Sequence, residues 1–329
     1  MMMPHPLRLD LTKRYSVFNH SSTALNTKPR RTVLLLGATG YLGQFVQLAL
    51  GSVPSILLIN KGGSRDLDFT KPWDDDNLGK DDIVVDVVVN CAAVSQPGEC
   101  AKDPERARLV NVPRGLVEWI ARRKNNKPLL IHLSTDHVYE GTRSFYKETD
   151  EVNPVNHYGA TKVEAERLIR SLYPCRHVIL RSSIIIGPQA PITPVNRPLL
   201  LQFIQTALAS GKPTSFFDDE WRCPVSVHDV VDVITACTLR AEEFEHAGET
   251  FNLGGPERLS RADMAEIVSD LCGLDRSLIQ RVSALTVNRG VKSPTDISMD
   301  SSKIEGFLGR RLTSFKETAR RCLSERIGT

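Results

Sequence analysis

The sequence predicts an α/β fold, with a doubly wound parallel sheet and a smaller C-terminal lobe. Two observations lead to this expectation. From Thr32 to about Gly187, short apolar runs alternate with helical segments, which is typical of strands joined by crossover helices. The runs are almost continuously apolar, as expected for parallel strands covered on both faces. Right-handed crossovers of this kind build a parallel sheet.

The expected elements follow one another at short spacing. Asp103 precedes Pro104, and an N-cap followed by proline at the first helical position predicts a helix start. Pro113 interrupts this helix, and a second piece runs to about Arg123. The remaining apolar patterns predict strands at 32–36, 55–59, 83–89, 129–133 and 178–181, and helices at 41–50 and 158–172.

After Gly187 the regular alternation stops, and four prolines occur between residues 188 and 198. Further helices are expected at 200–210, 229–240 and 261–272. Ser260 and Asp263 resemble a capping box for the last of these. We therefore predict one structural unit over residues 32–184. Residues 185–329 are expected to form mainly a smaller lobe, with one or two strands returning to the sheet.

Composition excludes several classes of protein. Of the 329 residues, 41% are apolar and 25% are charged, as in ordinary globular chains. No apolar run approaches the ~20 residues of a membrane helix, so we expect no membrane span. The net charge is +3, but residues 1–31 hold six basic residues and one acidic residue. The remaining chain is nearly neutral and offers no basic face for nucleic acid.

The seven cysteines are scattered and include no C-x-x-C pair. This pattern argues against a disulfide framework and against a zinc or other metal site, and it fits a reducing compartment. Residues 1–31 are predicted to be a disordered tail or a transit segment, because they are basic, hydroxylated and lack hydrophobic periodicity. We expect a cytoplasmic protein, with the plastid or mitochondrion as the alternative.

A glycine-rich turn, G-A-T-G-Y-L-G, directly follows the first strand and opens a helix. In such a turn the first glycine permits a tight bend, the second lets backbone approach a pyrophosphate, and the third allows close contact between helix and strand. The helix N-terminus adds free N–H groups. The alternative is a turn without a ligand. The context predicts a Rossmann-type NAD(P)-binding domain over residues 32–184, with cofactor contacts from Gly37, Thr39, Gly40, Tyr41, Leu42 and Gly43.

The end of the second strand favours NADPH over NADH. NAD-binding proteins place a carboxylate there to hold the ribose 2′-hydroxyl, whereas a basic residue accommodates a 2′-phosphate. Here the strand ends with Asn60 and Lys61, and Arg65 follows. We expect Asn60 and Lys61 to contact the cofactor. The alternative is that Lys61 and Arg65 are solvated loop charges.

Three residues form a candidate catalytic set. Tyr158 and Lys162 are four residues apart on a helix, which places them on one face about 6 Å apart. A nearby ammonium lowers the pKa of a phenol, which can then pass a proton to a carbonyl oxygen as hydride reaches the carbon. Alone, this spacing is a weak signal. Thr135 lies in Ser134-Thr-Asp136, at the carboxyl end of a predicted strand, where ligands of open α/β sheets bind. A simple Ser/Thr cap is the alternative.

With these motifs the chain resembles the extended short-chain dehydrogenases/reductases, and more narrowly the RmlD-like dTDP-4-dehydrorhamnose reductase group, over about residues 32–320. The reductase hallmark S-T-D-Y-V-F-D-G occurs as S-T-D-H-V-Y-E-G at 134–141. Further matches lie at 180–183, 222–230, 252–257 and 294–303. The resemblance implies catalytic roles for Thr135, Tyr158 and Lys162, with Tyr158 and Lys162 also at the cofactor. It implies substrate contacts from Ser134, Asp136 and Arg222, and further cofactor contacts from Asp68, Phe69, Cys91, Ala92 and Ala93.

Two departures from the reductase pattern are informative. The segment 90–99, N-C-A-A-V-S-Q-P-G-E, is closer to a related branch, the regulatory β subunit of methionine adenosyltransferase. Members of that branch bind NADP and need not turn over a nucleotide sugar. His137 replaces the tyrosine of the hallmark, and we interpret it as a hydrogen-bonded wall of the pocket rather than a base.

Two functions follow. The first is an NADPH-dependent reductase of a 4-keto group on a nucleotide-activated deoxysugar. The second is an NADP-binding regulator that docks onto the methionine adenosyltransferase catalytic subunit. The intact set of Thr135, Tyr158 and Lys162 favours the enzyme, and segment 90–99 favours the regulator. We expect the enzyme, because no member of the chemical set is missing.

The residues Asn60 and Lys61 at the end of the second predicted strand predict that the protein binds NADPH more tightly than NADH. Replacing Lys61 and Arg65 with alanine together should reduce this preference, because the positive charge that faces a 2′-phosphate is removed. Titration of the protein with each cofactor measures the two dissociation constants. Equal or reversed values in the unmutated protein would contradict the prediction.

Overall fold

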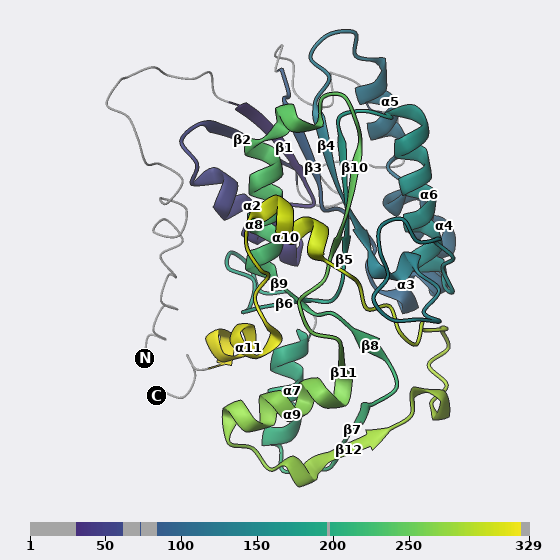
Figure 1. Cartoon of the computed structure of the whole chain (residues 1–329), viewed down its shortest axis with the longest axis vertical. Helices are drawn as coiled ribbons and strands as arrows, with labels where there is room; N and C mark the ends of the chain where they lie inside the picture. Colours follow the sequence, from purple (N-terminus) through teal and green to yellow (C-terminus); the bar gives the residue numbers. More distant parts are fainter. Residues whose placement is uncertain (1–30, 62–72, 74–83, 196–197, 324–329) are drawn as a thin grey trace.

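The computed structural model describes residues 31–61, 73, 84–195 and 198–323 (Figure 1). The expectations for residues 1–30, for Arg65 and for Asp68 and Phe69 lie outside the described residues. Of the helices in these ranges, none is both long and apolar enough to cross a membrane.

Six parallel strands form the central sheet, in the order β10–β5–β4–β3–β1–β2. This confirms the predicted α/β fold with a doubly wound, Rossmann-type parallel sheet. The strands are β1 (Arg31–Leu36), β2 (Ile56–Lys61), β3 (Val87–Asn90), β4 (Leu129–Thr135), β5 (His177–Ser182) and β10 (Glu249–Leu253).

The third strand is shorter than the range 83–89 expected from its apolar run. Residues 84–86 precede the strand, which begins at Val87. A side chain explains the difference: Asp86 Oδ2 accepts a hydrogen bond of 2.7 Å from Thr32 N. The Asp86 carboxylate therefore accepts from the N–H group of Thr32, which in a regular ladder would donate to a backbone carbonyl of the neighbouring strand. An apolar pattern alone does not reveal such a side-chain substitution.

Alternate residues of β1 enter two separate cores. Val33 and Leu35 lie in the core formed with α2 (Tyr41–Gly51) and α8 (Val227–Leu239). Leu34 and Leu36 lie in the core on the opposite face. There the covering helices are α5 (Arg114–Arg122) and α6 (His157–Leu172), and Figure 1 shows the two helix layers on either side of the sheet. The period of two along a strand therefore makes both faces apolar.

The predicted helix start at Pro104 is confirmed. Asp103 caps α4 (Pro104–Asn111), since its side chain accepts a hydrogen bond of 3.1 Å from Arg106 N. After Pro113, α5 begins as a separate helix. The preceding short helix, α3 (Pro97–Lys102), was not expected from the sequence.

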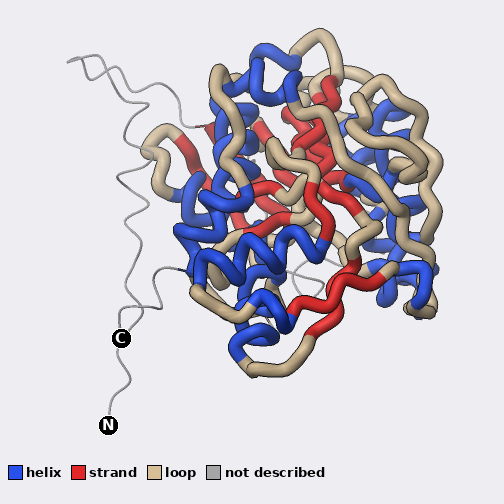
Figure 2. Tube along the Cα trace, turned by 60° about the horizontal axis from the view of Figure 1, so that its bottom comes forward, coloured by secondary structure: helices blue, strands red, loops and turns tan. Residues whose placement is uncertain are grey.

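The C-terminal lobe is built mainly from three helices that share one core, and it lies beside one end of the sheet (Figure 2). The predicted capping box is confirmed: Ser260 Oγ accepts from Asp263 N at 3.1 Å, and the Asp263 carboxylate accepts from Ser260 N at 2.9 Å. The helices are α7 (Leu200–Ala209), α9 (Arg261–Cys272) and α11 (Phe315–Leu323). Three two-stranded sheets accompany them, pairing β6 (Ile185–Ile186) with β9 (Val225–Ser226), β7 (Thr214–Phe217) with β12 (Ile279–Val282), and β8 (Trp221–Arg222) with β11 (Leu259–Ser260).

Part of the chain after residue 185 returns to the first unit. Strand β10 pairs with β5 at the edge of the sheet, as expected, and α8 packs beside α2. Helix α10 (Ser302–Leu308) lies against the same core through Ile304. The short 3-10 turns are η3 (Asp136–Val138), η4 (Ala241–Phe244), η5 (Arg276–Leu278) and η6 (Ala284–Thr286).

The glycine turn leaves no room for a side chain at Gly43. A Cβ atom there would lie 2.0 Å from the carbonyl oxygen of Gly37, which itself has a left-handed φ of +78°. Gly43→Ala should lower the free energy of unfolding by about 1–3 kcal/mol, since α2 must move off the turn. Chemical denaturation measures this value.

Gly51→Ala is the matched control in the same helix. Its Cβ would meet nothing closer than Leu58 Cδ2 at 3.9 Å. This variant should be as stable as the unmutated protein, or slightly more stable because alanine favours a helix. Equal losses in both variants would show that close contact at Gly43 does not matter.

Candidate functional site

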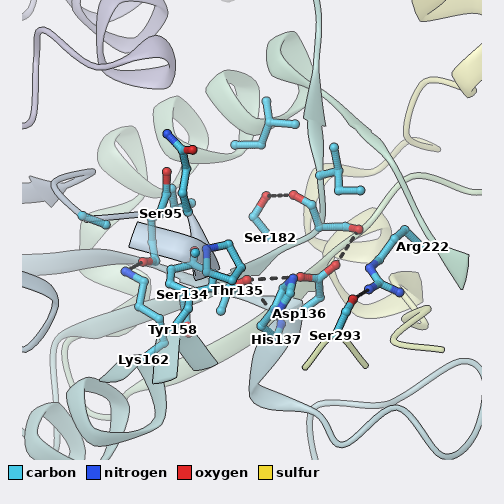
Figure 3. A pocket seen from close by; sticks show the side chains of 18 of the residues that line it. Ser95, Ser134, Thr135, Asp136, His137, Tyr158, Lys162, Ser182, Arg222 and Ser293 are labelled. Atoms are coloured by element: carbon cyan, nitrogen blue, oxygen red, sulfur yellow. Dashed lines mark hydrogen bonds between the residues drawn. The ribbon is translucent and has the colours of Figure 1, made fainter. Parts of the chain in front are cut away.

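A cavity of about 670 Å³ opens where the carboxyl ends of the strands meet the C-terminal lobe (Figure 3). Of the residues predicted from the sequence, it is lined by Gly40, Tyr41, Leu42, Gly43, Cys91, Ala93, Ser134, Thr135, Asp136, Tyr158, Lys162 and Arg222. The structure thus brings the glycine turn, the catalytic candidates and the substrate candidates to one space. The predicted residues Gly37, Thr39, Asn60, Lys61 and Ala92 do not line it.

The glycine turn presents a helix N-terminus to the cavity. Gly40 is the N-cap of α2 and provides no side-chain hydrogen bond, and the first turn of the helix contains no acidic residue. Gly37 N and Ala38 N donate to Lys61 O at 3.1 and 3.2 Å, which places the end of β2 directly against the turn. Uncapped N–H groups at a helix N-terminus suit the phosphates of a dinucleotide.

Lys162 is a buried ammonium at the floor of the cavity. Its side chain is 2% exposed, and Nζ donates to Leu133 O at 2.6 Å. Burial lowers the pKa of Lys162 to about 8, while the charges of Cys91, Glu166 and Cys100 oppose this shift. The group therefore remains mostly protonated at neutral pH and has further N–H donors for a ligand.

Tyr158 lies one helical turn before Lys162 and lines the same cavity. A buried asparagine, Asn111, holds this part of α6: Nδ2 donates to Thr161 Oγ1 at 3.0 Å and to Val94 O at 3.1 Å. Its Oδ1 accepts from Val94 N at 2.7 Å. Asn111 is therefore a positioning residue that joins the β3–α3 loop to the helix, and helical spacing gives no sign of it.

Thr135, the last residue of β4, and Asp136, the first residue of η3, form a small hydrogen-bonded group (Figure 3). Thr135 Oγ1 lies 3.1 Å from Asp136 Oδ1 and accepts from His137 N at 3.3 Å. Ser183 donates to Asp136 Oδ2 at 2.8 Å. Ser182, the last residue of β5, and Ser183, which follows it, also line the cavity and were not predicted.

A buried ion pair supports this floor. Arg181 donates to Glu166 through Nε at 3.1 Å and Nη2 at 2.7 Å, and both side chains are almost fully buried. Burial by itself raises the pKa of Glu166, but the bonds and charge of Arg181, with help from Ser134 and Arg170, lower it overall. Ser134 Oγ donates to Glu166 Oε1 at 2.7 Å, so only its lone pairs remain for a substrate.

The far wall of the cavity is basic. Arg222, Arg261, Arg289 and Lys292 line it. The carboxylates that face them are Glu220, which pairs with Arg289, and Asp136. Burial and the charge of Arg222 lower the pKa of Arg261 to about 10, so the guanidinium still carries its charge at pH 7. The Arg222 fork donates to Ser293 Oγ and to the carbonyls of Trp221, Pro294 and Thr295. An excess of cations over carboxylates favours an anionic ligand at this end.

Comparison with known protein families shows the family to which this chain belongs. The model of the RmlD substrate binding domain matches residues 31–327, a range that includes all the described residues. The chain belongs to this family. The resemblance expected from the motifs at 134–141 and 222–230 is thereby confirmed.

Relatives of this RmlD-family chain include both classes considered above. A probable low-salt glycan biosynthesis reductase, Agl14, of Haloferax volcanii is 30% identical over 233 residues, which cover 70% of this chain and 74% of the relative. Methionine adenosyltransferase 2 subunit beta of Bos taurus is 25% identical over 305 residues, 86% of this chain and 84% of the relative. The crystal structure of dTDP-4-dehydrorhamnose reductase from Bacillus anthracis in complex with NADP has a TM-score of 0.76 at 19% identity, covering 90% of this chain and 99% of that chain. This structural likeness shows the fold.

Glu166→Gln should lower the free energy of unfolding by about 3–5 kcal/mol, because it leaves the Arg181 guanidinium buried without its counter-charge. Urea denaturation at pH 7 measures the loss. Glu164→Gln, at an exposed pair with Arg108, is the control and should change the melting temperature little.

The same carboxylate predicts a pH dependence. Since the folded-state pKa of Glu166 lies below its ordinary value of 4.5, its stabilisation is present above pH 4.5 and is lost as the pH falls below that value. The unmutated protein should therefore lose more stability between pH 5 and pH 3 than Glu166→Gln. Parallel pH profiles of the two proteins would contradict this assignment.

Proposed function

We propose that this chain is an NADPH-dependent reductase that acts on a 4-keto group of a nucleotide-activated deoxysugar. The observation that carries the proposal is the convergence of Tyr158, Lys162 and Thr135 on the cavity that also contains the glycine turn and the basic wall. A reductase needs these components within one space, because the carbonyl must meet both a hydride donor and a proton donor.

The cofactor would lie from the glycine turn to Lys162. The uncapped N-terminus of α2 suits a pyrophosphate, and the spare N–H groups of Lys162 suit the hydroxyls of the nicotinamide ribose. The backbone carbonyl of Lys61 lies against the turn, and a basic residue in place of a carboxylate at this strand end supports NADPH over NADH. When bound, NADPH would supply the hydride.

Within this site, side chains of the protein would transfer the proton to the substrate. Tyr158 would donate its phenolic proton to the carbonyl oxygen, and the Lys162 ammonium would stabilise the phenolate left behind. Thr135 would bind the carbonyl oxygen by turning its hydroxyl proton toward it from Asp136 Oδ1. Burial of Lys162 and Tyr158 excludes bulk water, which strengthens both interactions.

The basic wall supports a substrate that carries a diphosphate. Arg261 and Arg289 belong to the C-terminal lobe and line the same cavity as Tyr158. A diphosphate bound to these two residues would therefore leave the attached sugar in the part of the cavity that contains Tyr158. Guanidinium forks match phosphate oxygens in geometry and charge. A neutral ligand would leave the excess positive charge of this wall uncompensated.

The second candidate is an NADP-binding regulator of the methionine adenosyltransferase catalytic subunit. The relatives named methionine adenosyltransferase 2 subunit beta favour it, as does segment 90–99. Ser95, Gln96, Pro97 and Gly98 of this segment line the cavity. In this case cofactor binding would tune the docking surface, and no keto sugar would be reduced.

Tyr158→Phe tests the reductase. With dTDP-4-dehydrorhamnose as the probe, the loss of NADPH absorbance should slow about 10²–10⁴-fold in kcat, because the proton donor is lost. The dissociation constant for NADPH should stay within about twofold. Lys162→Met should weaken both, since its ammonium is proposed to hold the ribose and to tune the phenol.

Tyr173→Phe is the matched control, at the opposite end of α6. Its hydroxyl donates to Pro128 O at 2.6 Å outside the cavity, so the variant should lose about 1 kcal/mol of stability and keep its turnover. Turnover within twofold of the unmutated protein in Tyr158→Phe would overturn the catalytic assignment. No turnover by the unmutated protein, together with stimulation of a methionine adenosyltransferase that Tyr158→Phe preserves, would favour the regulator.

A further inference from the structure

His137 is held beside Tyr158 by two elements. Its backbone N donates to Thr135 Oγ1, which ties it to the end of β4. Its carbonyl lies so close to α6 that a Cβ atom at Gly159 would come within 2.1 Å of it. The His137 ring meets the Tyr158 ring edge to face, with centroids 5.5 Å apart, and lines the cavity (Figure 3).

The side chain of Asn156 determines which ring nitrogen carries the proton. Asn156 Oδ1 accepts from Gly159 N at 2.9 Å and so caps α6. Its Nδ2 lies 3.1 Å from Lys292 O and 3.1 Å from His137 Nδ1. Both backbone partners require the same orientation of the amide, so the atom facing His137 is the NH₂ group. An amide nitrogen only donates; hence His137 Nδ1 accepts, and the ring proton is on Nε2.

Burial keeps the His137 ring neutral. Burial lowers the pKa of His137 to about 4. The carboxylates of Asp136 and Glu220 raise this pKa, and the guanidinium groups of Arg222 and Arg261 lower it. Tyr158 and Asn156 on the α6 side, with the Lys292 carbonyl, complete the surroundings. At pH 7 the neutral ring therefore has one N–H group, on the edge that Asn156 does not occupy. This group can donate a hydrogen bond, but the ring does not act as an acid.

We propose that His137 Nε2–H is a hydrogen-bond donor to the substrate, binding an oxygen of the sugar beside the carbonyl that Tyr158 protonates, and that Asn156 is the positioning residue that fixes its tautomer. This inference rests on the proposed function for the identity of the ligand. It assigns His137 a role in binding and orientation, and it leaves the proton transfer to Tyr158.

The tautomer can be tested without turnover. In the full chain, nitrogen NMR of the His137 ring should show Nε2 protonated and Nδ1 unprotonated from pH 6 to 8. Asn156→Asp keeps an acceptor for Gly159 N but offers Nδ1 only a carboxylate oxygen. The ring should then take a proton at Nδ1, and its titration should move upward in pH. Asn156→Ser, an uncharged control, should allow both tautomers. A proton on Nδ1 in the unmutated protein would overturn the proposal.

The donor role is tested by two substitutions at the same position. His137→Gln can place an amide N–H near the position of Nε2, whereas His137→Phe keeps a ring without a donor. With dTDP-4-dehydrorhamnose and NADPH, KM should rise about 2- to 10-fold in His137→Phe, remain near normal in His137→Gln, and kcat should change less. An unchanged KM in His137→Phe, or an equal loss in both variants, would overturn the proposal.

If the proposed reductase function is wrong, the experiments give a different result from the one expected if only the assignment of His137 is wrong. In the former case the unmutated protein would neither turn over dTDP-4-dehydrorhamnose nor bind dTDP-rhamnose in calorimetry with NADP⁺ present. The donor role toward the sugar would then fall with the function, while the NMR result would still decide the tautomer. Normal turnover combined with the wrong tautomer would instead overturn the assignment of His137 alone.

Discussion

The buried ion pair between Glu166 and Arg181 connects the elements on which the site depends. Glu166 lies on α6, Arg181 on β5, and Ser134, which donates to the same carboxylate, on β4. Arg181 also donates to the hydroxyl of Tyr139 at 2.9 Å. Two desolvated charges are costly unless their geometry is well satisfied, so this network strongly restricts how α6 can lie on the sheet. The orientation of α6 in turn sets the position of Tyr158.

The parallel strands place the candidate site residues at one edge of the sheet. The carboxyl ends of β1, β3, β4 and β5 all face the C-terminal lobe, and the residues that follow each strand line the cavity. A glycine turn after one strand, hydroxyl groups after two others and a helix that crosses them therefore meet without being close in sequence. The lobe closes this space and contributes most of its positive charge.

The two ends of the cavity differ in electrostatic character. Near Tyr158 and Lys162 the groups are few, buried and hydrogen-bonded, and the neutral His137 ring adds a donor without adding charge. At the opposite wall, three guanidinium groups outnumber the carboxylates of Glu220 and Asp136. Such a division suits a ligand with a neutral reactive sugar and a charged carrier, because each part meets surroundings that compensate it.

Local patterns determined much of this protein from the sequence alone: the buried strands, the glycine turn after β1, the capping box at Ser260 and the Tyr158–Lys162 spacing depend on neighbours in the chain. The shortened β3 was missed because the side-chain bond of Asp86 overrides an apolar pattern. The short helix α3 was also missed. Only the tertiary structure brought Ser183, Arg261 and Arg289 to the cavity and fixed the tautomer of His137 through Asn156. Those contacts depend on the path of the folded chain, which periodicity and spacing do not encode.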